Sequence, residues 1–226
     1  MNILTDIVKT KKKEIQDFYR TYDWETLHRL TLPTPRSFTE ALAEARRRKT
    51  PFFITEFKRK SPSEGWIFRE ADVESQILRY AQAGAGAISV LTDTPWFGGS
   101  YEDLRRAAAA LDTLPAGSPR PLLLQKDFVL DPVQVYLARQ AGADLILLIA
   151  AILEPEQIEA LLQTAAKLGM GAILEVHDPA ELAAVQHLDF PVLGINNRDL
   201  KTFRTALNRF NVVARQARGR YVIAES

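Results

Sequence analysis

From residue 52 onward the sequence repeats one pattern: a short apolar run, a polar residue, a turn, and an amphipathic segment that often closes on glycine. The seven apolar runs span residues 52–54, 87–91, 122–124, 145–149, 172–174, 192–195 and 221–223. Segments between them open with an N-cap followed by proline, as at Asp131-Pro132 and Asp178-Pro179. Apolar strands joined by crossover helices form a parallel sheet that is buried on both faces. The pattern therefore predicts an α/β fold, either doubly wound or closed into a barrel.

Polar residues at the ends of these runs favour the barrel. In an open sheet only strands near the switch point carry site residues, whereas in a barrel every strand ends at the same mouth. Six different runs end in or are followed by such residues: Glu56 with Lys58, Asp93, Lys126, Glu175, Asn196 and Glu225. We therefore expect a (β/α)8 TIM barrel.

The first fifty residues are predicted to form a helical extension packed on this barrel. Apolar residues recur at helical spacing between Ile3 and Phe18, which leaves the lysines at 11–13 on the expected solvent face. Ser37 followed by Glu40 resembles a capping box that opens a second helix, which should end before Pro51. We therefore expect two helices in residues 1–50, then an incomplete barrel in residues 51–226, together forming a single domain.

A TIM barrel needs eight strands, and the sequence stops at Ser226 after the seventh run. We expect the closing unit to be absent and the parent chain to be longer by roughly 30 residues. Phosphate in such barrels commonly sits at backbone amides after the seventh and eighth strands. The chain as given should therefore bind phosphate poorly and turn over slowly or not at all.

Composition and charge exclude several classes of function. A formal net charge of +1 gives no broad attraction for nucleic acid or for a membrane surface. The absence of cysteine excludes disulfides and thiolate chemistry, and with no export signal near Lys11–Lys13 it predicts a cytoplasmic protein. The run at 145–153 is too short to span a bilayer. No pair of histidines has metal-ligand spacing, so we expect no metal site.

Charged residues of both signs should meet at the barrel mouth. The predicted group contains two ammonium and three carboxylate groups: Glu56, Lys58, Lys126, Glu175 and Glu225. A lysine among carboxylates stays protonated and can donate to a carbonyl, while a crowded glutamate becomes more basic. The alternative is an ion-pair network that only lines the mouth. His177 follows Glu175 by two residues, but a loop histidine without a partner is more often structural or solvated.

Six motifs occur in an order that resembles the indole-3-glycerol phosphate synthase family. They are Glu56-Phe57-Lys58-Arg59-Lys60-Ser61-Pro62-Ser63, Ser89-Val90-Leu91-Thr92-Asp93 with Phe97-Gly98-Gly99-Ser100, Lys126-Asp127-Phe128, Leu174-Glu175-Val176, Gly194-Ile195-Asn196-Asn197-Arg198-Asp199-Leu200, and Ala224-Glu225-Ser226. Each motif alone is weak, but six in sequence are highly specific. The resemblance extends from the N-terminal helices to the last residue.

This resemblance implies a reaction and roles for residues. The family converts 1-(o-carboxyphenylamino)-1-deoxyribulose 5-phosphate into indole-3-glycerol phosphate with loss of carbon dioxide and water, and it uses no cofactor. The matched residues make Lys126 the general acid and Glu175 its partner and proton acceptor. Glu56 and Lys58 match the acid and base of the later dehydration, and the sequence leaves open which of them is the acid and which the base. Glu225 is expected in the site in a supporting role.

The predicted partner is a small phosphorylated molecule, whose carboxylate and phosphate both need donors. Arg198 offers a fork-shaped hydrogen-bond donor, and Asn196 offers an amide. Ser61 and Ser226 offer hydroxyl and backbone groups. Lys58 is a further candidate for binding the phosphate. Phe128, with Trp96 and Phe97, should form apolar walls for the anthranilate ring, although core packing is the alternative for these aromatic side chains. We expect the intact parent to be a monomer.

Two other interpretations remain open at this point. Another phosphate-binding barrel, such as phosphoribosylanthranilate isomerase, would need an aspartate and a cysteine, and this chain has no cysteine. A non-catalytic barrel, either a binding subunit or a folding fragment, is the alternative from a different class of protein.

Overall fold

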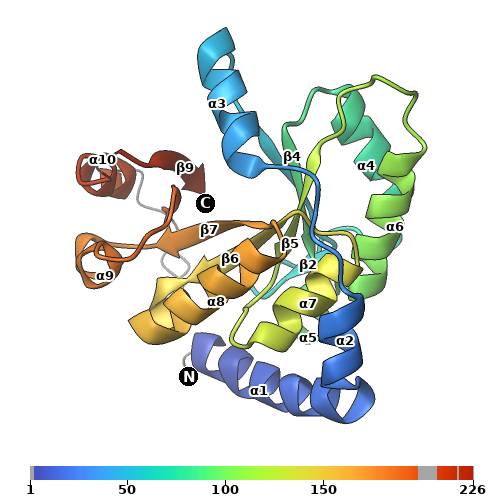
Figure 1. Ribbon diagram of the computed structural model, residues 1–226, viewed down its shortest axis with the longest axis horizontal. Coiled ribbons are helices and arrows are strands. Elements are labelled where there is room, and N and C mark those ends of the chain that lie inside the picture. The colour runs from blue at the N-terminus through green and yellow to red at the C-terminus, as the bar shows by residue number, and fades with distance from the viewer. Residues whose placement is uncertain (1–2, 198–207, 218, 226) are drawn as a thin grey trace.

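Seven parallel strands form one curled sheet, as the repeating pattern predicted (Figure 1). The computed structural model describes residues 3–197, 208–217 and 219–225. In spatial order the strands are β1 (Ile54–Phe57), β4 (Ala87–Leu91), β5 (Leu122–Lys126), β6 (Leu145–Ile149), β7 (Gly171–Val176), β8 (Val192–Asn196) and β9 (Tyr221–Glu225). Neighbours along the chain are also neighbours in the sheet, and every pair is parallel. The TIM-barrel class is thus confirmed.

Helices connect the strands, and most of them pack on the outside of the curl (Figure 1). They are α4 (Val73–Gln82), α5 (Thr94–Phe97), α6 (Tyr101–Asp112), α7 (Pro132–Gln140), the 3-10 turn η1 (Ala150–Ile152), α8 (Pro155–Lys167), α9 (Pro179–Val185) and α10 (Asn208–Ala214). The predicted caps are present: the Asp131 carboxylate accepts from Val133 N, and that of Asp178 accepts from Ala180 N. A small antiparallel pair, β2 (Lys60–Ser61) and β3 (Gly65–Trp66), follows β1.

Alternation along each strand divides the core into two layers. In β6, Leu145, Leu147 and Ile149 belong to the cluster inside the curl, whereas Ile146 and Leu148 pack in the layer beneath the helices. This follows from the two-residue period of a strand, and it explains why the run is apolar without a break. Each strand residue therefore faces either the inside of the curl or the helices outside it.

The first strand lies later in the chain than expected. The apolar run at 52–54 predicted a strand there, but pairing with β4 begins at Ile54 and continues to Phe57. Phe52 instead packs against Phe38 with ring centroids 5.9 Å apart, and Phe53 is exposed. The apolar side chain of Phe52 therefore serves a contact outside the sheet, whereas that of Phe53 is exposed to solvent, and Glu56 lies inside the strand.

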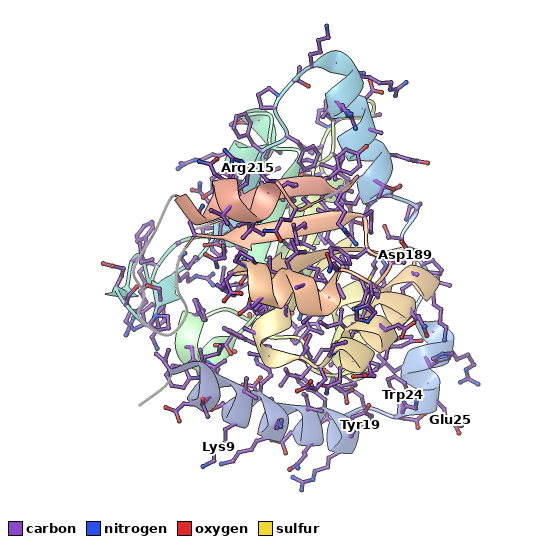
Figure 2. All side chains as sticks on the ribbon, turned by 90° about the vertical axis from the view of Figure 1, so that its left-hand side faces the viewer. Lys9, Tyr19, Trp24, Glu25, Asp189 and Arg215 are labelled. Carbon is purple, nitrogen blue, oxygen red and sulfur yellow. The ribbon has the colours of Figure 1, made fainter. Side chains whose placement is uncertain are left out.

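Residues 3–50 contain three helices, not the two predicted: α1 (Ile3–Thr21), α2 (Trp24–Leu30) and α3 (Phe38–Arg48). The missed helix, α2, has only seven residues, too few for a clear period. It is held by the Asp23 N-cap, whose carboxylate accepts from Thr26 N at 3.0 Å, and by an edge-on contact between Trp24 and Tyr136. Figure 2 shows Trp24 close to Tyr19 where α1 and α2 meet.

Lys11 is buried, so the expectation that the whole 11–13 lysine run is solvated was wrong. Only 1% of Lys11 is exposed, and its Nζ lies 3.0 Å from Asp93 Oδ2 and 2.9 Å from Asp127 Oδ1. Lys12 and Lys13 are exposed, as is Lys9, which points away from the body in Figure 2. Burial alone would lower the pKa of Lys11, but the two aspartates outweigh it and raise this pKa above its ordinary value. Helix α1 is thus ion-paired to the C-terminal ends of two strands.

No helix in the described part of the chain is long and apolar enough to cross a membrane.

Candidate functional site

The C-terminal ends of the strands enclose a cavity of about 360 Å³. Its floor is apolar and comes from the inner layer of the core, including Leu124, Leu147 and Ile173. The predicted residues that line it are Glu56, Lys58, Ser61, Lys126, Phe128, Glu175, Asn196 and Glu225. The structure therefore brings eight of the ten predicted site residues to one cavity, and the remaining two, Arg198 and Ser226, lie outside the described residues.

Strand alternation explains why the central charged residues face the cavity. Lys126 lies two residues after the inward Leu124, Glu175 two residues after the inward Ile173, and Glu225 two residues after Ile223. Side chains two residues apart on a strand share a face. The charged residue at the last inward position of each of these strands therefore lies at the barrel mouth.

Lys126 is the centre of the charge cluster. Its Nζ lies 2.7 Å from Glu225 Oε2 and 3.6 Å from Glu175 Oε2. Burial would lower the pKa of Lys126, but Glu225, Glu175 and Glu56 outweigh it and raise the pKa well above its usual range. Lys126 is therefore an ammonium group at neutral pH, able to donate a proton or hydrogen bond to a bound carbonyl.

Glu175 is a buried carboxylate, and its three polar neighbours are Lys126, Asn196 and His177. Asn196 Nδ2 donates to its Oε1 at 3.3 Å, and His177 Nε2 lies 3.3 Å from the same oxygen. Burial raises the pKa of Glu175, but Lys126 and then His177 outweigh that effect and hold the pKa below its ordinary value. The side chain is thus ionised and can accept a proton once the charge on its neighbours changes.

Glu225 fits inside the curl because position 194 has no side chain. A Cβ built on Gly194 would overlap Glu225 Oε1 and would lie 2.9 Å from Ile173 Cγ2. Burial is the main cause that raises the pKa of Glu225, with Lys126 opposing it and Glu175 adding to it. The two glutamates beside Lys126 therefore have pKa values displaced in opposite directions, an arrangement typical of acid and base pairs.

A second ion pair lines the cavity. Lys58 Nζ donates to Glu56 Oε1 at 2.5 Å, and Ser89 Oγ lies 3.5 Å from Glu56 Oε2. Both charged side chains are about one-third exposed, so this pair is more exposed to solvent than the cluster around Lys126. Ser89 was not among the predicted site residues, although it stands on the inner face of β4 opposite Glu56.

The apolar wall consists of Phe128 and Phe97, whose ring centroids are 6.0 Å apart. Trp96 was predicted beside them but is not among the described residues that line the cavity; it packs against the inner core cluster instead. Ser61 is buried in β2, where its Oγ accepts from Glu64 N at 3.1 Å. These groups give the cavity an aromatic side and a polar rim.

Two residues near the site have partners that the sequence did not predict. His177 was expected to lack a partner, but it contacts both Glu175 and Glu181, and the spacing of four residues between His177 and Glu181 was the available signal. Lys11 supports Asp127, which also accepts from Thr92 Oγ1 at 2.5 Å and from Phe128 N at 2.8 Å. Both residues therefore support cavity-lining side chains from behind.

The arrangement suits proton transfer to and from a bound organic molecule. Two ammonium groups and three carboxylates lie around an apolar cavity that could hold an aromatic ring. Within residues 3–197, 208–217 and 219–225, no group of three or more histidine, aspartate or glutamate side chains could hold a metal ion.

Comparison with known proteins agrees with the resemblance of the motifs. The sequence pattern of the family described as indole-3-glycerol phosphate synthase matches residues 4–226. The indole-3-glycerol phosphate synthase of Neisseria meningitidis serogroup B is 39% identical over an alignment covering 100% of this chain and 84% of the relative. Those of Bacillus cereus and Bacteroides thetaiotaomicron are 42% and 37% identical, covering 92% and 100% of this chain and 75% and 83% of the relatives.

Proposed function

Because the chain belongs to the indole-3-glycerol phosphate synthase family, we propose that it closes the pyrrole ring of indole-3-glycerol phosphate in tryptophan biosynthesis. The substrate is 1-(o-carboxyphenylamino)-1-deoxyribulose 5-phosphate, and the reaction releases carbon dioxide and water. The observation that carries this proposal is the position of Lys126, an ammonium group held between Glu175 and Glu225 beside an aromatic wall.

In this proposal Lys126 is the general acid. As the aromatic carbon attacks the ribulose carbonyl, negative charge develops on the carbonyl oxygen, and the Lys126 ammonium group gives it a proton. Glu175 is the adjacent proton acceptor and keeps Lys126 charged before the reaction. Glu56 and Lys58 serve the dehydration that follows, with the division of acid and base between them left open.

Substrate binding is assigned to groups around the reacting atoms. Phe128 contacts the anthranilate ring, and Asn196, Ser61 and Glu225 contact polar groups of the substrate. We assign Arg198 and Ser226 to the substrate anions on the family motifs alone, because both lie outside the described residues.

We further propose that residues 1–50 and 51–226 fold as one domain, supported by the ion pairs from Lys11 to Asp93 and Asp127. A single cooperative unfolding transition would bear this out. The protein should lie in the cytoplasm, since a chain without cysteine suits a reducing compartment. We also expect it to act as a monomer. Size-exclusion chromatography and cell fractionation test these two points.

The activity is tested by adding the carboxyphenylamino-ribulose phosphate to purified protein and following the fluorescence of the indole product. Formation of indole-3-glycerol phosphate with release of carbon dioxide, even at a low rate, is the expected result. Phosphoribosylanthranilate, the substrate of the rival isomerase, should remain unchanged under the same conditions. Conversion of phosphoribosylanthranilate alone would replace this proposal with the rival, and conversion of neither compound would leave the non-catalytic barrel.

Gly194→Ala should lower both stability and turnover. The added methyl group overlaps Glu225 Oε1 and crowds Ile173, so we expect a loss of about 1–3 kcal/mol in the free energy of unfolding, typical of overpacking. Turnover falls because a displaced Glu225 no longer pairs with Lys126. Denaturant unfolding and steady-state kinetics measure the two effects.

The double variant with Glu225→Ala is the matched control, because it removes the overlapping oxygen. It should recover part of the lost stability, because the crowding of Ile173 remains, but none of the turnover. If Gly194→Ala costs as much with Glu225→Ala as without it, crowding between these two residues is not the cause.

A further inference from the structure

A chain of titratable side chains leads from Glu175 to the outer surface, away from the cavity. His177 follows β7 and is only 6% exposed. Its Nε2 lies 3.3 Å from Glu175 Oε1, and its Nδ1 lies 3.1 Å from Glu181 Oε2. Glu181 belongs to α9, and 24% of its side chain is exposed. Among the described residues, neither His177 nor Glu181 lines the cavity.

The proposed reaction consumes a proton in each turnover. A bond forms between the ribulose carbonyl carbon and the aromatic carbon that bears the carboxylate, and the carbonyl oxygen takes one proton. The bond to the carboxylate then breaks, its electron pair returns to the ring, and carbon dioxide leaves. Loss of the hydroxyl as water takes a second proton, and breaking the adjacent carbon–hydrogen bond returns one. The site must therefore gain one proton from solvent before the next turnover.

We propose, on the basis of the function proposed above, that Glu181, His177 and Glu175 form the path by which Lys126 regains this proton from solvent. Glu181 collects the proton at the surface, His177 passes it on at the C-terminal end of β7, and Glu175 delivers it to Lys126. Substrate fills the cavity during the reaction, so a path that leaves from the opposite side of Glu175 stays open when the mouth is blocked.

The positions of two carboxylates support a charged His177 in the resting site. His177 Nδ1 is within hydrogen-bond distance of Glu181 Oε2, and Nε2 is at ion-pair distance from Glu175 Oε1 without forming a hydrogen bond. A neutral imidazole carries a proton on only one nitrogen, whereas the imidazolium places positive charge beside both carboxylates. Burial would lower the pKa of His177, but Glu175 and Glu181 outweigh it and raise the pKa to about 9. Below this pH the imidazolium is loaded with the proton to be passed on.

The direction of transfer follows from the charge on Lys126. While Lys126 is an ammonium group, its charge holds down the pKa of Glu175, so the proton stays on His177. After Lys126 has given its proton to the substrate, this charge is gone and burial raises the pKa of Glu175. Glu175 then becomes a proton acceptor for His177 and a donor for the neutral Lys126 amine. Transfer is thus coupled to turnover.

His177→Ala tests the path through kinetics. We expect kcat to fall by about 10–100-fold with little change in KM, because loss of a positioned proton-transfer group affects turnover more than binding. Imidazole added to the buffer should restore kcat in proportion to its concentration, which a merely structural role would not produce. His187→Ala is the matched control, since His187 is exposed, and it should leave kcat unchanged.

The same path is tested without catalysis by following the histidine resonances in NMR. His177 should titrate near pH 9 in the unchanged protein and at a lower pH in Glu181→Gln, whose side chain carries no charge. Unchanged kcat in His177→Ala, or a loss of kcat that imidazole does not relieve, would overturn the path. So would a His177 titration that Glu181→Gln leaves in place. An inactive unchanged protein would instead contradict the proposed function.

Discussion

Replacing Lys126 with methionine should lower kcat by about 10²–10⁴-fold, the usual contribution of a general acid. Methionine keeps the length and apolar stem of lysine but has no proton to donate to the carbonyl oxygen. The variant also leaves Glu175 and Glu225 as neighbouring carboxylates without their shared cation. Steady-state kinetics with the carboxyphenylamino-ribulose phosphate measures the loss of turnover.

Lys167→Met is the matched control for this substitution. Lys167 is exposed in the last turn of α8 and does not line the cavity, so its replacement should leave kcat within twofold. Circular dichroism of both variants separates a chemical defect from an unfolded protein. A loss below tenfold in folded Lys126→Met protein would remove Lys126 from the role of general acid.

Much of the barrel could be predicted because its strands are buried on both faces. The unbroken apolar run Leu145–Ile149 faces the inner core with one set of residues and the helices with the other. Such runs are short and separated by capped helices, so they stand out even without knowledge of contacts. The bounds of the first strand were harder to predict. Phe52 precedes the strand, and its apolar side chain packs against Phe38, a contact that no local sequence pattern reveals.

The centre of the candidate site was predictable for the same reason. Lys126, Glu175 and Glu225 are charged residues at the inward positions where apolar runs end, and in a barrel all such positions meet. Their distances and the opposite directions of the pKa values of Glu175 and Glu225 were not predictable. These depend on the depth of burial and on Gly194, which leaves space for Glu225.

Lys11 could not be placed from composition, because lysine is usually solvated. Its partners Asp93 and Asp127 come from two strands far along the chain. The spacing of the buried residues in α1 provides one signal. Leu4, Ile7 and Lys11 follow helical spacing and are the three buried residues of α1, so Lys11 continues the apolar face.

Lys11→Met should therefore destabilise the protein by about 3–5 kcal/mol, as expected when one partner of a buried ion pair is removed. The methionine side chain fills the space but leaves Asp93 and Asp127 buried without their cation. Asp127 also accepts from Phe128 N at 2.8 Å, so the disturbance should extend to the aromatic wall of the cavity. Urea unfolding gives the change in the free energy of unfolding.

Lys12→Met is the control for Lys11→Met, because Lys12 is the next residue of the same helix and is exposed. Surface substitutions of this kind usually change stability by less than about 0.5 kcal/mol in either direction. The pair of variants thus compares the same chemical change on the buried and solvated faces of α1. Equal unfolding midpoints for the two variants would mean that the ion pairs of Lys11 contribute nothing to holding α1 on the barrel, and that its apolar contacts through Leu4 and Ile7 are sufficient.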